Sequence, residues 1–295
     1  NLERERGITI FSKQAEFELG NRGITLLDTP GHVDFSAEME RTLQVLDYAI
    51  LVINGADGVQ GHTMTLWRLL ARYQIPTFLF INKMDQDGTD KEKLLAELKK
   101  RLSDNCVDFT WEKSALQSQF LEDVSVCDEE LLEKYLETEE ISTSDIRKVI
   151  KERKLFPCFF GSALKMTGVE EFLHGLEKYC ETPTYPSEFG AKVFKIARDD
   201  QGNRLSYMKI TGGTLKVKEL LTDTEKADQI RIYSGAKFEL AKEAPAGTIC
   251  AVTGLSQTHP GQGFGIERES EMPVLEPVLN YRILLPEDCD VHQML

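Results

Sequence analysis

The stretch TFLFINKMD, residues 77–85, consists of a short apolar run, TFLFI, followed directly by the polar sequence NKMD. An uncharged run rich in aromatic and β-branched side chains predicts a strand that is buried on both faces, as in a parallel sheet. Three more runs have the same form: ITLLD at 24–28, AILVIN at 49–54 and FPCFFG at 156–161. Because helical patterns separate these runs, we expect an α/β domain with helices on both faces of a mostly parallel sheet.

Other patterns in the same part of the sequence predict its remaining secondary structure. Residues 8–19 alternate in polarity and predict an extended segment. Apolar residues at helical spacing predict helices near 35–46, 94–102 and 172–179. Residues 105–155 are acidic and helical in character, which favours a solvated helical insertion. A surface for a partner protein is the alternative interpretation of this acidic segment.

A change of pattern follows the stretch TPTYP at 182–186, whose two prolines predict a stiff linker. Short strands and glycine turns come after it, which is typical of an all-β barrel or sandwich. We therefore expect an α/β domain over residues 1–183, a β-barrel domain over 184–286 and the start of a third domain at 287–295.

Composition limits the class of protein. The 295 residues are 41% hydrophobic and 28% charged, as in ordinary globular proteins. With 49 acidic and 35 basic residues the net charge is −14, which argues against a protein that coats nucleic acid with its whole surface. There is no run of 18 apolar residues, so no membrane span is expected. The six cysteines lack C-x-x-C spacing, which favours reduced thiols and a cytoplasmic location.

Three polar motifs follow three of the predicted strands. They are DTPGH at 28–32, NKMD at 82–85 and GSALK at 161–165. Ligands of open α/β sheets bind at the carboxyl ends of the strands, so each motif stands where a ligand site is expected.

The first motif has the chemistry of a phosphate site. Asp28 could hold Mg²⁺ beside nucleotide phosphates, or simply cap a turn. Gly31 lets its backbone N–H approach a phosphate oxygen. His32 follows directly and could orient a water molecule for attack on a γ-phosphate.

The second motif has the chemistry of a base site. The Asp85 carboxylate can accept two hydrogen bonds from one base edge, and guanine offers such donors whereas adenine does not. Asn82 would fix the loop and the base, and the stem of Lys83 would cover the plane of the base. A polar turn without a ligand is the alternative.

Together these motifs resemble those of translation-factor GTPases. RERGITI at 4–10 resembles the end of their first switch, DTPGHVDF at 28–35 resembles their second switch, and NKMD and GSAL resemble their guanine-recognition loops. The resemblance covers essentially the whole chain. It implies a P-loop-NTPase-type α/β GTPase domain followed by an all-β barrel domain that docks on the small ribosomal subunit.

The resemblance also implies roles for individual residues. Thr9 and Asp28 would hold Mg²⁺, His32 would be catalytic, and the Ala163 N–H would bind the guanine O6. GTP or GDP would contact eleven residues: Asp28, Thr29, Pro30, Gly31, His32, Asn82, Lys83, Asp85, Ser162, Ala163 and Leu164.

The members of this class differ in the length of the segment between the second and the third motif. Here only 76 residues separate Asp85 from Ser162. Elongation factor G usually carries a larger insertion, whereas the tetracycline ribosomal-protection proteins have a compact segment with a stretch like DEELLEKY at 128–135. The resemblance therefore favours a ribosome-dependent GTPase that releases tetracycline from the ribosome, monomeric and without a membrane partner. An elongation factor G-like translocase and a ribosome-binding module without hydrolysis are the alternatives.

One family motif is missing from the sequence. The phosphate loop G-x-x-x-x-G-K-[ST] does not occur, and the chain begins at Asn1 without an initiator Met. We therefore expect the chain to be a piece of a longer protein. This piece alone should bind GTP weakly, hydrolyse none and expose apolar surface that the missing strand and helix would cover.

Overall fold

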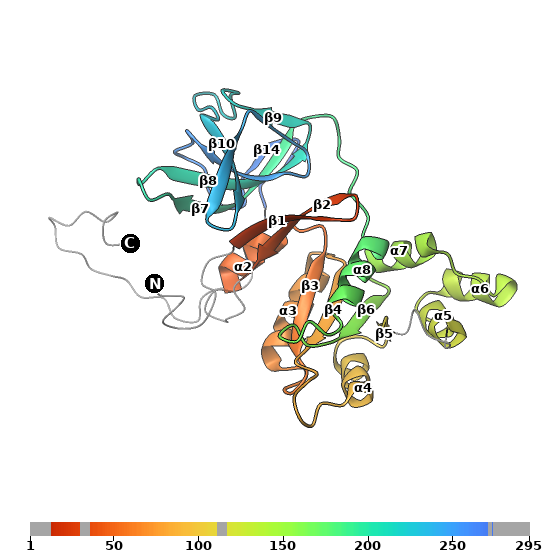
Figure 1. The fold of residues 1–295 in the computed structure, drawn as a ribbon. Helices are drawn as coiled ribbons and strands as arrows, with labels where there is room; N and C mark the ends of the chain where they lie inside the picture. Colours follow the sequence, from red (N-terminus) through yellow and green to blue (C-terminus); the bar gives the residue numbers. More distant parts are fainter. Residues whose placement is uncertain (1–12, 30–35, 111–116, 271–272, 274–295) are drawn as a thin grey trace.

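A computed structural model describes residues 13–29, 36–110, 117–270 and 273. Figure 1 shows an α/β part and an antiparallel β part, with a β-hairpin lying between them. This is the architecture expected from the sequence, with the corrections given below.

A four-stranded parallel sheet forms the centre of the α/β part, with the strand order β3-β4-β6-β5. Its strands are β3 (Ala49–Asn54), β4 (Thr77–Asn82), β5 (Cys106–Asp108) and β6 (Phe156–Phe160). The apolar runs predicted β3, β4 and β6. Strand β5 was missed, because the segment 105–155 was expected to be wholly helical and three residues are too few to show a period.

Helices cover both faces of this sheet, as predicted. They are α2 (Ser36–Leu43), α3 (Gly61–Arg72), α4 (Lys91–Arg101), α5 (Gln117–Ser125), α6 (Glu129–Thr138), α7 (Thr143–Lys151) and α8 (Val169–Tyr179). Alternate side chains of β4 point to opposite faces of the sheet. Phe80 belongs to one core cluster with Phe172 of α8, whereas Leu79 belongs to the other with Trp67 of α3 and Leu98 of α4.

Helices α5 to α7 form the acidic insertion, which projects from the sheet in Figure 1. Side-chain caps fix the helix starts: Asp128 accepts a hydrogen bond from the Leu131 N–H, and Ser142 forms a capping box with Asp145. The turn between α6 and α7 contains Glu139 in the left-handed region (φ 57°). The helical expectation is therefore confirmed over most of this segment.

The run 24–28 was expected to be a strand of the parallel sheet, and this expectation is wrong. Strand β2 (Arg22–Asp28) instead pairs antiparallel with β1 (Lys13–Leu19) in a separate two-stranded sheet. A tight turn at Gly20 (φ 59°) permits this pairing. Near the turn, Arg22 donates hydrogen bonds to the carbonyl oxygens of Glu177 (2.7 Å) and Cys180 (2.6 Å), which attaches the hairpin to the end of α8.

The β domain contains a six-stranded antiparallel sheet and a small two-stranded sheet. Its strands are β7 (Gly190–Arg198), β8 (Arg204–Gly212), β9 (Thr214–Lys216), β10 (Gln229–Ser234), β11 (Lys237–Ala241), β12 (Glu243–Pro245), β13 (Ile249–Thr253) and β14 (Gly263–Gly265). Fully buried Met208, Ile210 and Val252 lie in its core. The sequence missed the short strands β11, β12 and β14.

Exposed apolar side chains occur on β3, the edge strand of the parallel sheet. Ile50 is 37% and Val52 is 58% exposed, although the run AILVIN was expected to be buried on both faces. The five cysteines in the described ranges are free thiols, as expected. Among the helices described, none has the length and apolarity to cross a membrane.

Candidate functional site

The second and third motifs meet at the carboxyl ends of the neighbouring strands β4 and β6. The Asn82 side chain joins them: its Oδ1 accepts hydrogen bonds from the Lys83 N–H (2.8 Å) and from the Ala163 N–H (2.9 Å). One amide therefore ties the loop after β4 to the loop after β6. This is the fixing role that the sequence predicted for Asn82 within its own loop, extended to the neighbouring loop.

Asp85 lies against the same loop. Its carboxylate lies beside the Ser162 hydroxyl, and its Oδ2 is 3.3 Å from the Lys165 Nζ. The hydroxyl and the ammonium group both favour the ionised form, so they lower the pKa of Asp85 below its usual value. Ser162 is 2% exposed and thus has little freedom to turn away. The arrangement keeps Asp85 ionised and aimed, as an acceptor for base N–H donors requires.

A glycine contact forms the base of the two loops. The Gly161 N–H donates to the Ile81 carbonyl (2.9 Å), and the Gly161 carbonyl accepts from the Met84 N–H (3.0 Å). A Cβ at Gly161 would lie 2.2 Å from the Thr167 carbonyl oxygen and 3.2 Å from the Gly168 Cα. Only glycine at position 161 therefore lets the loop after β6 fold back this closely on Thr167 and Gly168.

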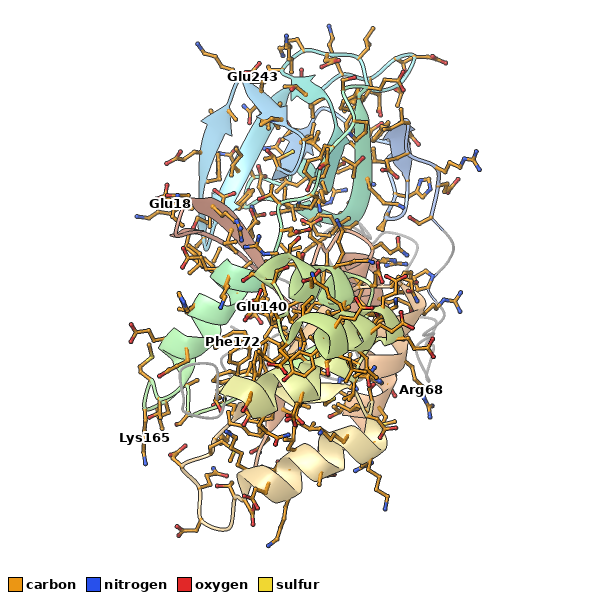
Figure 2. All side chains as sticks on the ribbon, turned by 90° about the vertical axis from the view of Figure 1, so that its right-hand side faces the viewer. Glu18, Arg68, Glu140, Lys165, Phe172 and Glu243 are labelled. Carbon is orange, nitrogen blue, oxygen red and sulfur yellow. The ribbon has the colours of Figure 1, made fainter. Side chains whose placement is uncertain are left out.

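The outer parts of the loops remain accessible. Leu164 is 90% exposed, and the exposed Lys83 has a left-handed backbone (φ 63°) beside the Asn82 amide. Non-glycine residues in this region are strained and cluster at functional sites. Figure 2 shows Lys165 on the side of the α/β part that lies away from Glu243 of the β domain. The two loops therefore offer a surface that the β domain does not cover.

The Ala163 amide does not point to an empty space. The resemblance assigns its N–H to the guanine O6, but in this structure Asn82 accepts it. A base that binds here has to share or replace this hydrogen bond.

The first motif is only partly described. Asp28 is the last residue of β2, opposite Lys13, and Thr29 follows it. Because β2 lies outside the parallel sheet, the expectation that all three motifs follow strands of one sheet is wrong. Within the described ranges, Asp28 makes no hydrogen bond or ion pair with either of the other loops. The remaining predicted residues of this site lie outside the described residues: Thr9, Pro30, Gly31 and His32.

The described residues fit Mg²⁺ only as a partial site. No group of three His, Cys, Asp or Glu side chains in the described ranges could hold a metal ion. Mg²⁺ beside a nucleotide typically uses one or two protein ligands and takes the others from phosphates and water. Asp28 fits that donor set, and Thr9 would be the second ligand.

Sequence reasoning assigned no role to Lys165, although it closes the third motif, and did not select Thr89. Lys165 forms the ion pair with Asp85, and Thr89 donates through its hydroxyl to the Met84 carbonyl (2.9 Å). Both lie within four residues of a predicted site residue in the sequence, and this closeness was the available signal. Only the folded loops show which atoms are in contact.

Family models match two parts of the chain. The model described as the elongation factor Tu GTP binding domain matches residues 1–182, and that of elongation factor G domain 2 matches residues 188–264. These matches agree with the α/β part and the β part of the structure.

Whole-chain relatives are of two kinds. Elongation factor G of Ureaplasma urealyticum serovar 10 is 30% identical over an alignment of 367 residues, covering 99% of this chain and 53% of that protein. The tetracycline resistance protein TetP of Clostridium perfringens is 32% identical over 316 residues, covering 96% of this chain and 48% of that protein. This chain therefore spans about half the length of the relatives it matches.

A solved structure has a similar fold. A protein of Thermus thermophilus superposes with a TM-score of 0.77 at 23% identity, covering 97% of this chain and 50% of that one. The likeness supports the two-part fold.

Replacing Ser162 by alanine tests the support of Asp85. In the intact protein with its upstream sequence, we expect the S162A change to weaken GDP binding about tenfold, because the carboxylate loses the hydroxyl that orients it. The pKa of Asp85 rises toward its usual value, yet the carboxyl stays ionised at neutral pH, so the loss should be the same from pH 6 to 8. Titration with fluorescent GDP measures it.

Ser256 provides the control, because its hydroxyl donates to the Glu225 carboxylate in the β domain, away from the loops. The S256A change should leave the GDP affinity at the parent value. Equal affinities of S162A and the parent protein would contradict the role of Ser162.

Proposed function

The chain belongs to the family of GTPases that share the elongation factor Tu GTP-binding domain, and on that premise we propose that the intact protein is a ribosome-dependent GTPase that releases tetracycline from the ribosome. The observation that supports this choice within the family is the compact segment between Asp85 and Ser162.

The proposed mechanism begins with the base. Asp85 accepts the guanine N1–H and N2–H donors, Asn82 holds the two loops together, and Lys83 and Leu164 flank the base. The Ala163 N–H turns to the guanine O6. Because adenine presents no matching pair of donors, it leaves the Asp85 carboxylate unpaired, which disfavours ATP.

The first motif acts at the phosphates. Thr29, Pro30 and Gly31 bring the backbone to the γ-phosphate, and His32 orients the attacking water. Bound Mg²⁺ supplies charge neutralisation of the phosphate oxygens, with Asp28 and Thr9 as its ligands.

We extend the proposal to the surroundings of the protein. The partners are ribosomal RNA and ribosomal proteins, the protein works as a monomer, and its location is the cytoplasm, where ribosomes act. The domain limits 1–183, 184–286 and 287–295 belong to the same proposal, as does the inactivity of this polypeptide without a phosphate loop.

A resistance measurement tests the function. The full-length gene is expressed in a tetracycline-sensitive bacterium, and the lowest inhibitory concentration of tetracycline is determined. We expect a several-fold rise that is lost in the His32→Ala variant, because hydrolysis requires the water-orienting imidazole. Soluble protein without a rise in the inhibitory concentration would contradict the tetracycline function.

The second candidate is an elongation factor G-like translocase, which the elongation factor G relatives favour. The same strains separate the two. Ribosome-stimulated GTP hydrolysis without any rise in the inhibitory concentration would indicate the translocase, and ribosome binding without hydrolysis would indicate a binding module.

A further inference from the structure

A buried charged cluster joins the two parts of the molecule. The Lys209 ammonium group on β8 donates to the Asp47 Oδ1 (2.6 Å) and to the Val45 carbonyl oxygen (3.0 Å), both just after α2. The Lys209 side chain is 6% exposed and that of Asp47 is 40% exposed. We call Asp47, Tyr185 and Lys209 the junction cluster.

The linker supplies the third member of the junction cluster. The Tyr185 hydroxyl lies beside the Asp47 carboxylate, and the Lys209 Nζ lies 5.8 Å from the centre of the Tyr185 ring. Burial, followed by the negative charge of Asp47, raises the pKa of Tyr185 to about 12, so the hydroxyl remains a donor at neutral pH. A Cβ at Gly247 (φ 92°) would lie 3.1 Å from the ring, so this glycine makes room for Tyr185.

The strand pattern explains why a lysine is found there. Met208 and Ile210 point into the core of the β domain and are fully buried, so Lys209 points to the opposite side of β8, toward the α/β part. A buried ammonium group is tolerated only when hydrogen-bond partners replace its water. Here the partners of Lys209 come from a segment 162 residues away in the sequence.

Helix α2 is held at more than one point. Within the α/β part, the fully buried Glu40 accepts a hydrogen bond from the Tyr73 hydroxyl (2.7 Å) at the end of α3. Toward the β domain, Val45 packs with Phe194 and Ile249. Lys209 adds the charged contact just beyond the helix.

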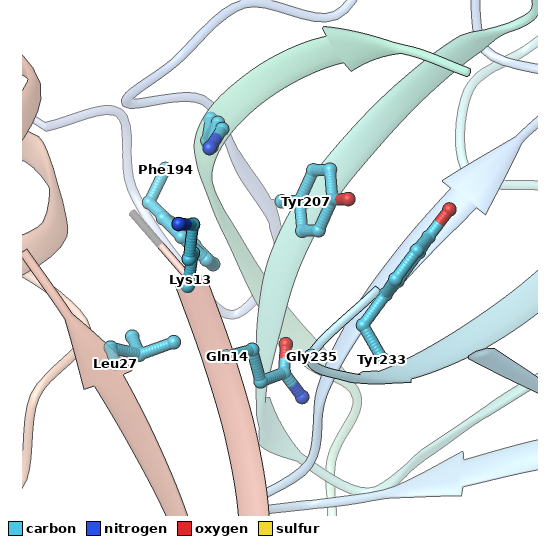
Figure 3. A pocket seen from close by; sticks show the side chains of 8 residues that line it. Lys13, Gln14, Leu27, Phe194, Tyr207, Tyr233 and Gly235 are labelled. Carbon is cyan, nitrogen blue, oxygen red and sulfur yellow. The ribbon is translucent and has the colours of Figure 1, made fainter. Parts of the chain in front are cut away.

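The hairpin on the other side of the second switch motif is attached to the same β domain. Leu27 packs against the cluster of Val45 and Ile249, the Gln14 Nε2 donates to the Ile249 carbonyl (3.2 Å), and the Gly235 N–H donates to the Gln14 carbonyl (2.7 Å). Leu27 and Gln14 of the hairpin line a cavity of about 80 Å³ together with Phe194 and Tyr207 of the β domain. Figure 3 shows these side chains at the contact between the hairpin and the β domain. The β domain therefore contacts both β2 and α2, the two elements that flank residues 29–35.

We propose that Lys209 is a positioning residue for GTP hydrolysis: by holding the end of α2 through Asp47 and Val45, it sets the position of α2 relative to β2. This inference rests on the proposed GTPase function. The β domain contributes no residue to the predicted nucleotide site, yet through Lys209 it acts on the geometry of hydrolysis. Small displacements of catalytic groups lower turnover strongly, so loss of this contact should affect turnover more than binding.

The test uses the full-length protein with its phosphate loop and compares ribosome-stimulated turnover with GDP affinity. In K209M we expect the kcat for GTP to fall about tenfold, while the Kd for GDP stays within twofold, because the loops that hold the base lie away from the junction cluster. K209R keeps the charge and should recover at least half of the parent kcat. The double variant D47N/K209M should be no slower than K209M, because both changes remove one interaction.

Lys218 supplies the matched control. It forms an ion pair with Asp228 (2.7 Å) inside the β domain, so K218M also removes a lysine charge but leaves the junction cluster intact. K218M should hydrolyse GTP at the parent rate. Thermal melting of all variants confirms that each is folded at the assay temperature.

Several outcomes would overturn the proposal. A K209M protein with the parent kcat would show that the junction cluster does not influence hydrolysis. Equal losses of kcat and GDP affinity, or equal losses in K209M and K218M, would assign Lys209 a general structural role. A parent protein that hydrolyses no GTP on ribosomes would instead refute the proposed function, and the positioning role with it.

Discussion

Replacing Asp85 by asparagine is expected to lower the affinity of the intact protein for GDP by about a thousandfold. The asparagine keeps the size of the side chain but exchanges an acceptor oxygen for an NH₂ donor. In a binding pose against guanine, that donor meets the N1–H and N2–H donors of the base, and neither side is satisfied. The Ser162 hydroxyl and Lys165 hold the side chain in place, so it has little freedom to avoid the mismatch.

The D85N variant should also show a gain. Xanthine carries a carbonyl oxygen where guanine has its N2 amino group, and that oxygen can accept a hydrogen bond from the asparagine NH₂. D85N should therefore bind xanthosine diphosphate more tightly than GDP. Titrations with GDP and with xanthosine diphosphate measure this change in nucleotide preference.

Asp87 gives the control for this experiment, since it lies two residues further along the same loop and is exposed. The D87N variant should bind GDP like the parent. If D85N retained the GDP affinity of the parent within threefold, Asp85 would not recognise the base.

Replacing Gly161 by alanine should destabilise the α/β part by about 3 kcal/mol and abolish measurable GDP binding. The added Cβ would lie 2.2 Å from the Thr167 carbonyl oxygen and 3.1 Å from the Phe80 ring. The closest neighbour is backbone, which cannot rotate away as a side chain can. Relief of the clash has to shift residue 161 away from Thr167 within the loop after β6, and that shift strains the hydrogen bond from the Met84 N–H to the Gly161 carbonyl, which joins this loop to the loop after β4.

Urea unfolding measures the stability change, and a GDP titration measures the binding. Gly61 serves as the matched site: its Cβ would meet no atom within 4 Å, so G61A makes the same chemical change without a clash. G61A should unfold like the parent. A G161A protein as stable as G61A would mean that the loop after β6 can accommodate the added Cβ without cost.

The sequence predicted those parts of the site that local patterns encode. Asn82 and Ala163 could be placed near each other because each follows an apolar run that forms a strand of the same parallel sheet. The run at 24–28 has the same composition, but its strand pairs with β1 instead, and composition carries no information about the partner of a strand.

Other features depend on contacts between distant residues. Strand β5 is three residues long and has no period of its own; its pairing with β6 defines it. Lys209 looks like any lysine of an amphipathic strand, and its role is visible only when Asp47 and Tyr185 lie beside it. The sequence therefore predicts the loops after β4 and β6 better than it predicts the contacts between distant residues.

The turn between α6 and α7 offers a practical use. Glu139 and Glu140 are exposed there, and the insertion that carries them is tied to the sheet through the other ends of its helices. Exposed turns of this kind accept inserted sequence more readily than strands or helices do. A fluorescent dye or a short epitope tag at this turn would report on the protein without touching the loops after β4 and β6 or the junction cluster.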